Sequence, residues 1–178
     1  MGFIVFMAVA FGFFWAIDRN KDSGLGVVLL LAFTFFMGVM LSQILSVALG
    51  MTNGGALIAM AGSATAAIFF SLAMYTSVSK RDFSFMGGFL FAGMVVALLA
   101  GLGAMFFELP ALGLAVSAMV ALLSAGLILF ETSRIVNGGE TNYVMATLSL
   151  FVSIFNLFNY RICINLPFHS RNYFSKAF

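Results

Sequence analysis

Six long apolar runs, separated by short polar connections, make up most of the chain. They span residues 1–17, 25–49, 55–79, 84–107, 110–130 and 142–160. A helix needs about 20 mostly apolar residues to cross the hydrocarbon layer of a bilayer. Since these runs do not show the two-residue alternation of a barrel strand, they must satisfy their backbone hydrogen bonds as helices. The pattern therefore predicts an all-α fold, a polytopic transmembrane helical bundle with six spans in residues 1–160.

The composition fits a lipid environment. Hydrophobic residues make up 63% of the 178 residues and charged residues only 8%, whereas a soluble domain has about 25% charged residues. The net charge of +2 is too small to indicate a nucleic-acid partner. Residues 1–17 lack the basic start and the cleavage pattern of a signal peptide, so we expect them to form a retained membrane segment.

Basic residues are distributed unevenly among the five connections, which carry two, none, two, none and one Lys or Arg in chain order. Such residues concentrate on the cytoplasmic side of membrane proteins. The charge pattern therefore predicts that connections 18–24, 80–83 and 131–141 are cytoplasmic. The N-terminus would then lie outside, which leads us to expect a further helix upstream of Met1.

Four of the runs carry small residues at every fourth position, which places these residues on one face of a helix. In lipid, such faces allow close backbone approach and helix association. We interpret them as packing faces rather than the lining of a pore. The four sets are Thr34, Gly38, Ser42, Ser46 and Gly50; Gly55, Ala59, Ser63, Ala67 and Ser71; Gly93, Ala97 and Gly101; and Gly113, Ser117, Ala121 and Ala125.

Glu131 closes the fifth run, and Arg134 follows one helical turn later. One interpretation is an interfacial ion pair between the two, which would mark the end of the span. The other is that Glu131 faces the bundle interior, where a charge is costly and usually functional, as a candidate proton or cation site. Ser149, Ser153 and Asn156 share a face of the last run. They could make interhelical hydrogen bonds to such a group or line a wet cavity.

Enzyme chemistry is not predicted. The only histidine, His169, lies in the tail, so neither a Ser-His-Asp relay nor a histidine metal site can be assembled in the bundle. Cys163 is the only cysteine, which excludes an intramolecular disulfide and a cysteine metal cluster. Glu108 precedes Pro110, as expected for a solvated helix start. We expect no cofactor.

The stretch ILFETSRIVNGGETNYVMATLSLFVSIFNLF, residues 128–158, resembles the hallmark region of the Bax inhibitor family of membrane proteins. YTSVSKRDFSFMGGFLFAGMVV and FFELPALGLAVSA, upstream, are similar to the bacterial YccA-like branch of that family. The resemblance implies a seven-helix fold, with the last helix near the centre, in the bacterial inner membrane. This chain would lack the first helix. Residues 161–178 depart from the family pattern, and we expect a disordered tail or the product of a shifted reading frame.

The resemblance implies two activities. The YccA-like branch is associated with the membrane-bound, ATP-dependent protease FtsH, whose action on membrane proteins it restrains. The wider family includes pH-sensitive calcium leak channels that use two acidic residues on the last two helices. Glu131 matches the first acid, whereas Ser153 occupies the second position, so any calcium site would be weak and would need help from Asn156 and backbone carbonyls. We place protease modulation first, the leak second and a non-functional gene fragment third.

Overall fold

The structure is a computed structural model that describes residues 2–107 and 109–165, and within these ranges it consists of helices and their connections, without strands. The all-α prediction is therefore confirmed. Five of the helices are long and apolar enough to cross a membrane, with the span that includes α4 starting at Ser84. The helices are α1 (Gly2–Arg19), α2 (Gly24–Leu49), α3 (Gly54–Ser79), the short 3₁₀ helix η1 (Ser84–Met86), α4 (Gly87–Phe106), α5 (Pro110–Val136) and α6 (Tyr143–Asn165).

Helices α5 and α6 are longer than their apolar runs. Helix α5 extends to Val136, so that Glu131 and Arg134 are helical rather than part of a loop. It ends where Gly138 adopts a positive φ of 75°. Helix α6 extends to Asn165, past the predicted end at residue 160. Glu108, His169 and the rest of the tail beyond residue 165 lie outside the described residues.

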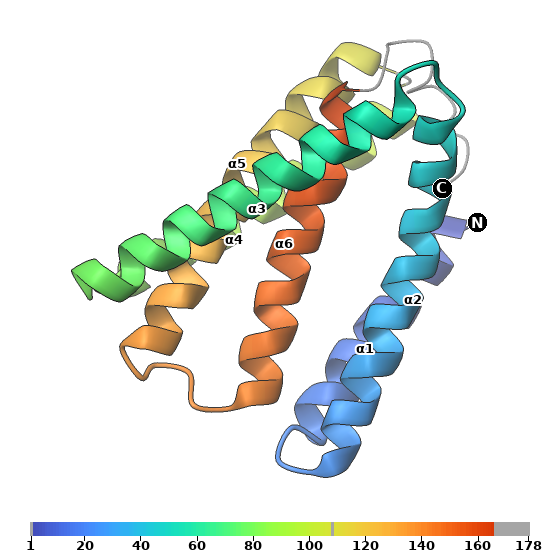
Figure 1. Cartoon of the computed structure of the whole chain (residues 1–178). Helices are drawn as coiled ribbons and strands as arrows, with labels where there is room; N and C mark the ends of the chain where they lie inside the picture. Colours follow the sequence, from blue (N-terminus) through green and yellow to red (C-terminus); the bar gives the residue numbers. More distant parts are fainter. Residues whose placement is uncertain (1, 108, 166–178) are drawn as a thin grey trace.

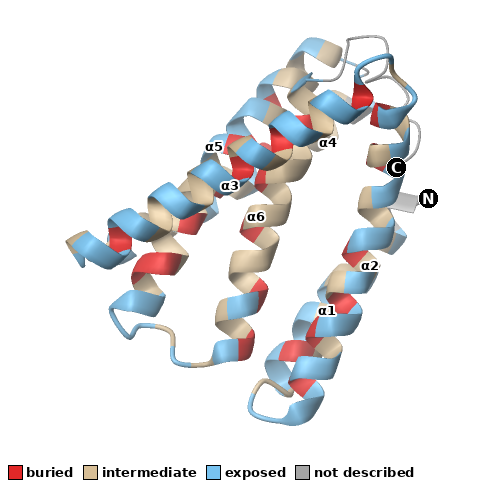
Figure 2. Cartoon of the chain, viewed as in Figure 1, coloured by how far each residue is buried: buried red, intermediate tan, exposed pale blue. Residues whose placement is uncertain are grey.

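Helix α6 lies between two groups of helices, the α1–α2 hairpin on one side and α3, α4 and α5 on the other (Figure 1). One apolar cluster joins α6 to the hairpin through Phe33, Leu148 and neighbouring side chains. A second cluster joins it to α5 and α3 through Ile128, Leu157 and Ile68. On α2, α3, α5 and α6 the buried residues form narrow stripes (Figure 2), as expected for helices whose remaining faces contact lipid.

The small-residue faces have two different outcomes. The face of α4 packs against larger side chains of α5, and a β-carbon added at Gly93 would lie 2.7 Å from Leu123 Cδ2. Ala121, on the face of α5, packs instead in the cluster with Leu157 of α6. On α2 and α3 the prediction of packing within this chain is wrong, because most residues of these faces are exposed. Their hydroxyl groups tolerate lipid because they bond within their own helix, as Ser42 Oγ does to the Val39 carbonyl oxygen at 2.6 Å.

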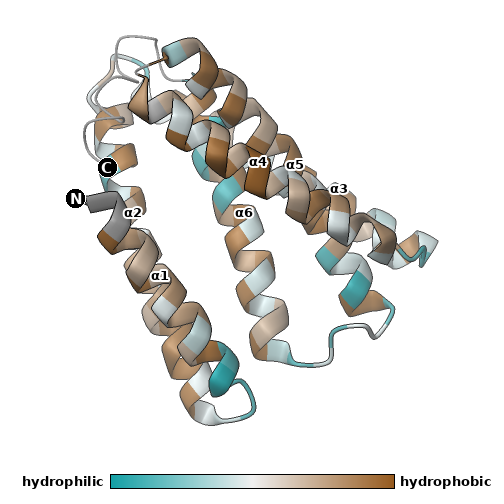
Figure 3. Ribbon diagram, turned by 180° about the vertical axis from the view of Figure 1, so that it is seen from behind, coloured by the Kyte–Doolittle hydropathy of each residue, from teal (hydrophilic) through white to brown (hydrophobic). Residues whose placement is uncertain are grey.

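The three charged connections lie at one end of the bundle and are joined by hydrogen bonds. Asn142 Nδ2 donates to the Lys21 carbonyl oxygen at 3.2 Å and to Asp22 Oδ1 at 2.8 Å. Ser133 Oγ donates to the Arg81 carbonyl oxygen at 2.9 Å. Hydrophilic residues gather at the α1–α2 and α5–α6 connections, whereas the helices between them are mainly hydrophobic (Figure 3).

Candidate functional site

The carboxylate of Glu131 on α5 points towards α6. Ser153 Oγ donates a hydrogen bond to Glu131 Oε2 at 3.0 Å. Ser153 is only 2% exposed, and Glu131 is half-buried. The structure therefore brings together two of the four predicted site residues, on the two helices that sequence analysis had paired.

Glu131 lies near the end of its span, whereas Ser153 lies near the middle of α6. Glu131 precedes the last residue of α5, Val136, by five positions, which corresponds to about 7.5 Å along the helix axis. Ile128, one turn deeper, and Leu157 are both fully buried and close the interior side. The carboxylate therefore stands between the apolar core and the polar connections.

Arg134 does not pair with Glu131. Its guanidinium forms an ion pair with Glu140, with Nη2 and Oε2 3.2 Å apart, and lies over the Phe130 ring at 5.6 Å from the centroid. The glycines after α5 explain this arrangement. Gly139 N donates a hydrogen bond to the Arg134 carbonyl oxygen at 2.7 Å, so the chain turns back and Glu140 lies beside Arg134. The predicted pair between Glu131 and Arg134 is therefore replaced by one with Glu140.

The other polar residues of α6 do not complete the site. Asn156 is half-buried, but no hydrogen bond joins it to Glu131 among the described residues. Ser149 Oγ instead bonds to the Ala146 carbonyl oxygen at 3.2 Å. One carboxylate and one hydroxyl can hold a proton or a weakly bound cation, whereas calcium usually takes six to eight oxygen ligands. No group of three His, Cys, Asp or Glu side chains that could hold a metal occurs in the described part of the chain.

Sequence analysis did not identify Ser133, a fully buried residue two positions after Glu131. Its Oγ accepts a hydrogen bond from Phe83 N at 3.1 Å and from Asn137 Nδ2 at 3.2 Å, besides donating to Arg81. It thus ties the α3–α4 connection to the end of α5. Asn142 caps the start of α6, because its Oδ1 accepts hydrogen bonds from Val144 N at 3.0 Å and Met145 N at 3.1 Å.

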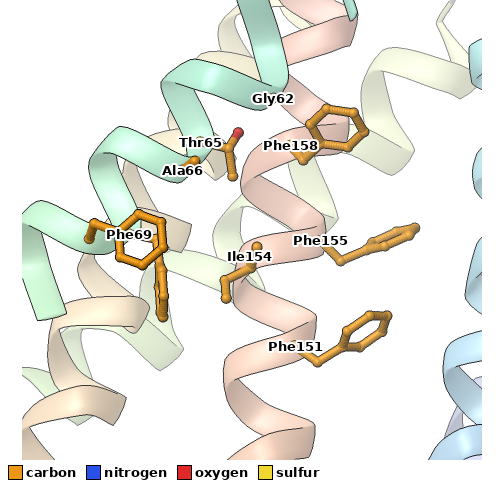
Figure 4. Close-up of a pocket in the computed structure, with 9 residues that line it drawn as sticks. Gly62, Thr65, Ala66, Phe69, Phe151, Ile154, Phe155 and Phe158 are labelled. Carbon is orange, nitrogen blue, oxygen red and sulfur yellow. The ribbon is translucent and has the colours of Figure 1, made fainter. Parts of the chain in front are cut away.

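A groove of about 400 Å³ between α3 and α6 is a different feature (Figure 4). Thr65 is its one hydroxyl-bearing residue, and that hydroxyl bonds to the Ala61 carbonyl oxygen at 2.7 Å. The groove offers no free polar group to orient a ligand, so we do not assign it as the functional site. It is lined by Gly62, Thr65, Ala66, Phe69, Phe70, Phe151, Ile154, Phe155 and Phe158.

Comparison with known proteins gives a consistent result over nearly the whole chain. Residues 1–170 match the family model described as "Inhibitor of apoptosis-promoting Bax1". The chain is 42% identical to the Escherichia coli K12 protein named "Modulator of FtsH protease YccA", over 96% of this chain and 77% of the relative. It is 45% identical to an uncharacterised protein of Pseudomonas aeruginosa, over 83% of this chain and 67% of the relative.

A membrane protein of Vibrio cholerae is 43% identical over 82% of the chain and 65% of the relative. No solved structure shows a significant match. The family match includes α5, α6 and the pair formed by Glu131 and Ser153. The apolar helices, their arrangement around α6 and these relatives together show that the chain is a multi-pass membrane protein that belongs to the Bax inhibitor family.

Proposed function

We propose that this protein modulates membrane-protein quality control by binding the membrane-bound protease FtsH, and that it has no catalytic activity of its own. The proposal rests on the 42% identity with the E. coli protein named as a modulator of that protease. A bundle of membrane-spanning helices can meet a membrane-anchored protease within the lipid, where small-residue faces support helix association. The outward faces of α2 and α3 are of this kind.

The test uses purified FtsH and the full chain in proteoliposomes, with an unrelated multi-pass protein at equal amounts as the control. We expect the two proteins to co-purify from detergent, and a membrane substrate to be degraded more slowly when this chain is present. The chain itself should remain intact during the assay, because a competing substrate would be degraded by the protease, whereas a modulator would not. Unchanged substrate turnover with the chain in excess, or degradation of the chain at the substrate's rate, would contradict the proposal.

A second candidate function is a cation leak that uses Glu131. It is supported by the position of that carboxylate, which is half-buried and hydrogen-bonded to Ser153 across the α5–α6 interface. Ionisable groups that face a bundle interior commonly mark ion or proton pathways. Ser153 offers a hydroxyl in place of a second acid, so calcium binding at this pair would be weak.

Calcium flux into liposomes tests the leak. Glu131→Gln should abolish flux above that of empty liposomes, whereas Glu140→Gln should retain it. The two variants remove the same charge at the same end of the bundle, but Glu140 is paired with Arg134 and does not contact Ser153. Absence of flux in the unsubstituted protein, or equal loss in both variants, would eliminate this function.

We also propose that the end of the bundle that carries connections 18–24, 80–83 and 131–141 faces the cytoplasm of a bacterial inner membrane. The excess of basic residues at this end supports this orientation. Membrane-impermeant maleimide, applied to intact cells that carry Cys163→Ala with a cysteine at Asn53 or at Lys80, should label only position 53. Labelling at position 80 alone would reverse the orientation.

A further inference from the structure

The connection between α3 and α4 is held rigidly against the end of α5. Ser133 bonds to both the Arg81 carbonyl oxygen and Phe83 N, and Asn137 Nδ2 donates to the same Arg81 carbonyl oxygen at 3.2 Å. These contacts use only backbone groups of the connection. The side chains of Lys80 and Arg81 are exposed and remain available for other partners.

These two residues differ from the other basic residues at this end of the bundle. Lys21 is paired with Asp18 at 3.0 Å, and Arg134 is paired with Glu140. Arg19 lies over the Trp15 ring at 5.4 Å from its centroid. Within the described residues, Lys80 and Arg81 have neither an ion-pair partner nor an aromatic ring beneath them, and with the ionised Asp82 the connection keeps a net charge of one positive unit.

The acidic residue beside them does not neutralise this pair directly. The carboxylate of Asp82 accepts hydrogen bonds from Ser84 N, at 2.8 Å, and from Ser84 Oγ. These bonds lower the pKa of Asp82 below its ordinary value, so the carboxylate stays ionised and bound to the turn. In contrast, residues 18–24 contain two acidic and two basic side chains, and that connection carries no net charge.

A row of aromatic side chains runs beside the two basic residues. The Tyr75 and Phe83 ring centroids are 6.1 Å apart, and those of Phe83 and Phe85 are 6.4 Å apart. Phe85 is 80% exposed and lies at the start of a membrane span, one residue after Ser84. Trp and Tyr side chains at the ends of membrane spans commonly lie at the level of the lipid headgroups, whereas the wholly apolar ring of Phe85 can contact the acyl chains below them.

We infer that Lys80 and Arg81, with Phe85 beside them, form a binding site for the headgroup of an anionic phospholipid at the α3–η1–α5 corner. The basic side chains would contact the phosphate, and Phe85 would lie against the upper part of the acyl chains. The exposed ring at the start of a span favours a lipid over an acidic protein segment, which would not need an apolar contact at this depth. This site is independent of the proposed protease and leak activities.

Selectivity for lipid tests the inference directly. The full chain is reconstituted in mixed phosphatidylglycerol and phosphatidylcholine bilayers, and spin-labelled lipids report the relative association constant of each. We expect a preference for phosphatidylglycerol that falls about fivefold in each single variant, Lys80→Gln or Arg81→Gln, and about thirtyfold in the double variant, since each basic residue near an anionic surface contributes about 1 kcal/mol. Phe85→Gln should weaken the association of both lipids at this site without changing the charge.

The matched control is Arg19→Gln/Lys21→Gln, which removes the same charge from the neighbouring connection. It should retain the preference for phosphatidylglycerol. Equal loss in both double variants would indicate a general effect of net charge and would overturn the assignment, as would the absence of any preference in the unsubstituted protein. Two further results would refute a phospholipid site. One is displacement of phosphatidylglycerol by millimolar glycerol phosphate. The other is that the variant Lys80→Gln/Arg81→Gln loses binding to an acidic protein while its lipid preference stays unchanged.

Discussion

Replacing Ser133 with alanine should loosen the attachment of the α3–α4 connection to α5. Its hydroxyl group is fully buried and makes three hydrogen bonds, to the Arg81 carbonyl oxygen, Phe83 N and Asn137 Nδ2. Alanine fits the same space, so the variant removes these bonds without introducing a clash. The expected loss of stability therefore comes from hydrogen-bonding groups left without a partner rather than from altered packing.

The size of the change in the free energy of unfolding depends on which hydrogen bonds each partner of Ser133 keeps in the variant. The Arg81 carbonyl oxygen keeps its bond from Asn137, and Asn137 lies at the exposed end of the helix, where water can replace the lost contact. Phe83 N has no second partner among the described residues. An unsatisfied buried donor costs about 1–3 kcal/mol, and an ordinary lost hydrogen bond about 0.5–1.5 kcal/mol. Because Phe83 is only half-buried, water can reach its amide in part, and we expect Ser133→Ala to lower the free energy of unfolding by about 1–2 kcal/mol.

Unfolding by SDS in mixed micelles, followed by circular dichroism, measures this change. The control is Ser77→Ala on α3, because the exposed Ser77 hydroxyl bonds only within its own helix, to the Ala73 carbonyl oxygen at 2.8 Å. Hydrogen exchange should also show faster exchange at the Phe83 amide in Ser133→Ala alone. If both variants unfold at the same SDS fraction and the Phe83 amide keeps its protection, the three-way bond has no energetic role.

Three further predictions concern the connections. Gly54→Ala should destabilise the protein by about 2 kcal/mol or more, because a β-carbon there would lie 2.0 Å from the Ala48 carbonyl oxygen. Gly55→Ala, which has nothing within 4 Å of the added carbon, should be neutral or stabilising in the same SDS assay. Asn142→Ala should cost about 1 kcal/mol through the lost helix cap and release the Lys21 connection, which faster tryptic cleavage at Lys21 would report; unchanged cleavage would argue against the bridge. The lowered pKa of Asp82 predicts a stabilising contribution that is present above its ordinary pKa of 3.8 and is lost as the pH falls through the lower pKa of the folded state. Asp82→Asn should remove this acid-dependent step from the free energy of unfolding measured between about pH 5 and 3. An unchanged pH profile would contradict the assignment to Asp82.

Helical periodicity predicted which face of the last helix would supply a partner for Glu131, but not which residue of that face. The apolar runs placed Glu131 near the end of one helix and Ser149, Ser153 and Asn156 on a shared polar face of the next, and the family resemblance singled out position 153. The contact at 3.0 Å joins Glu131 to that residue. Its role in binding a proton or an ion stays a prediction.

The ends of the helices and the direction of their faces were harder to predict. Residues 131–136 are polar enough to be taken for a loop, but they remain helical in α5, where Ser133 bonds to residues about 50 positions away in the sequence. Similarly, the spacing of Gly38 and Ser42 defines a face of α2 without indicating which neighbour, if any, covers it. Both properties depend on contacts between distant segments, which hydropathy and spacing do not contain.

The unequal lengths of α5 and α6 link the site to membrane thickness. With 27 residues, α5 is about 40 Å long, and with 23 residues α6 is about 35 Å long, against a hydrocarbon layer of about 30 Å. Each helix must therefore lean or protrude, and α5 must do so more than α6. A thicker bilayer would bring both helices closer to upright, so hydrophobic mismatch acts directly on the crossing that holds the Glu131 carboxylate beside the Ser153 hydroxyl.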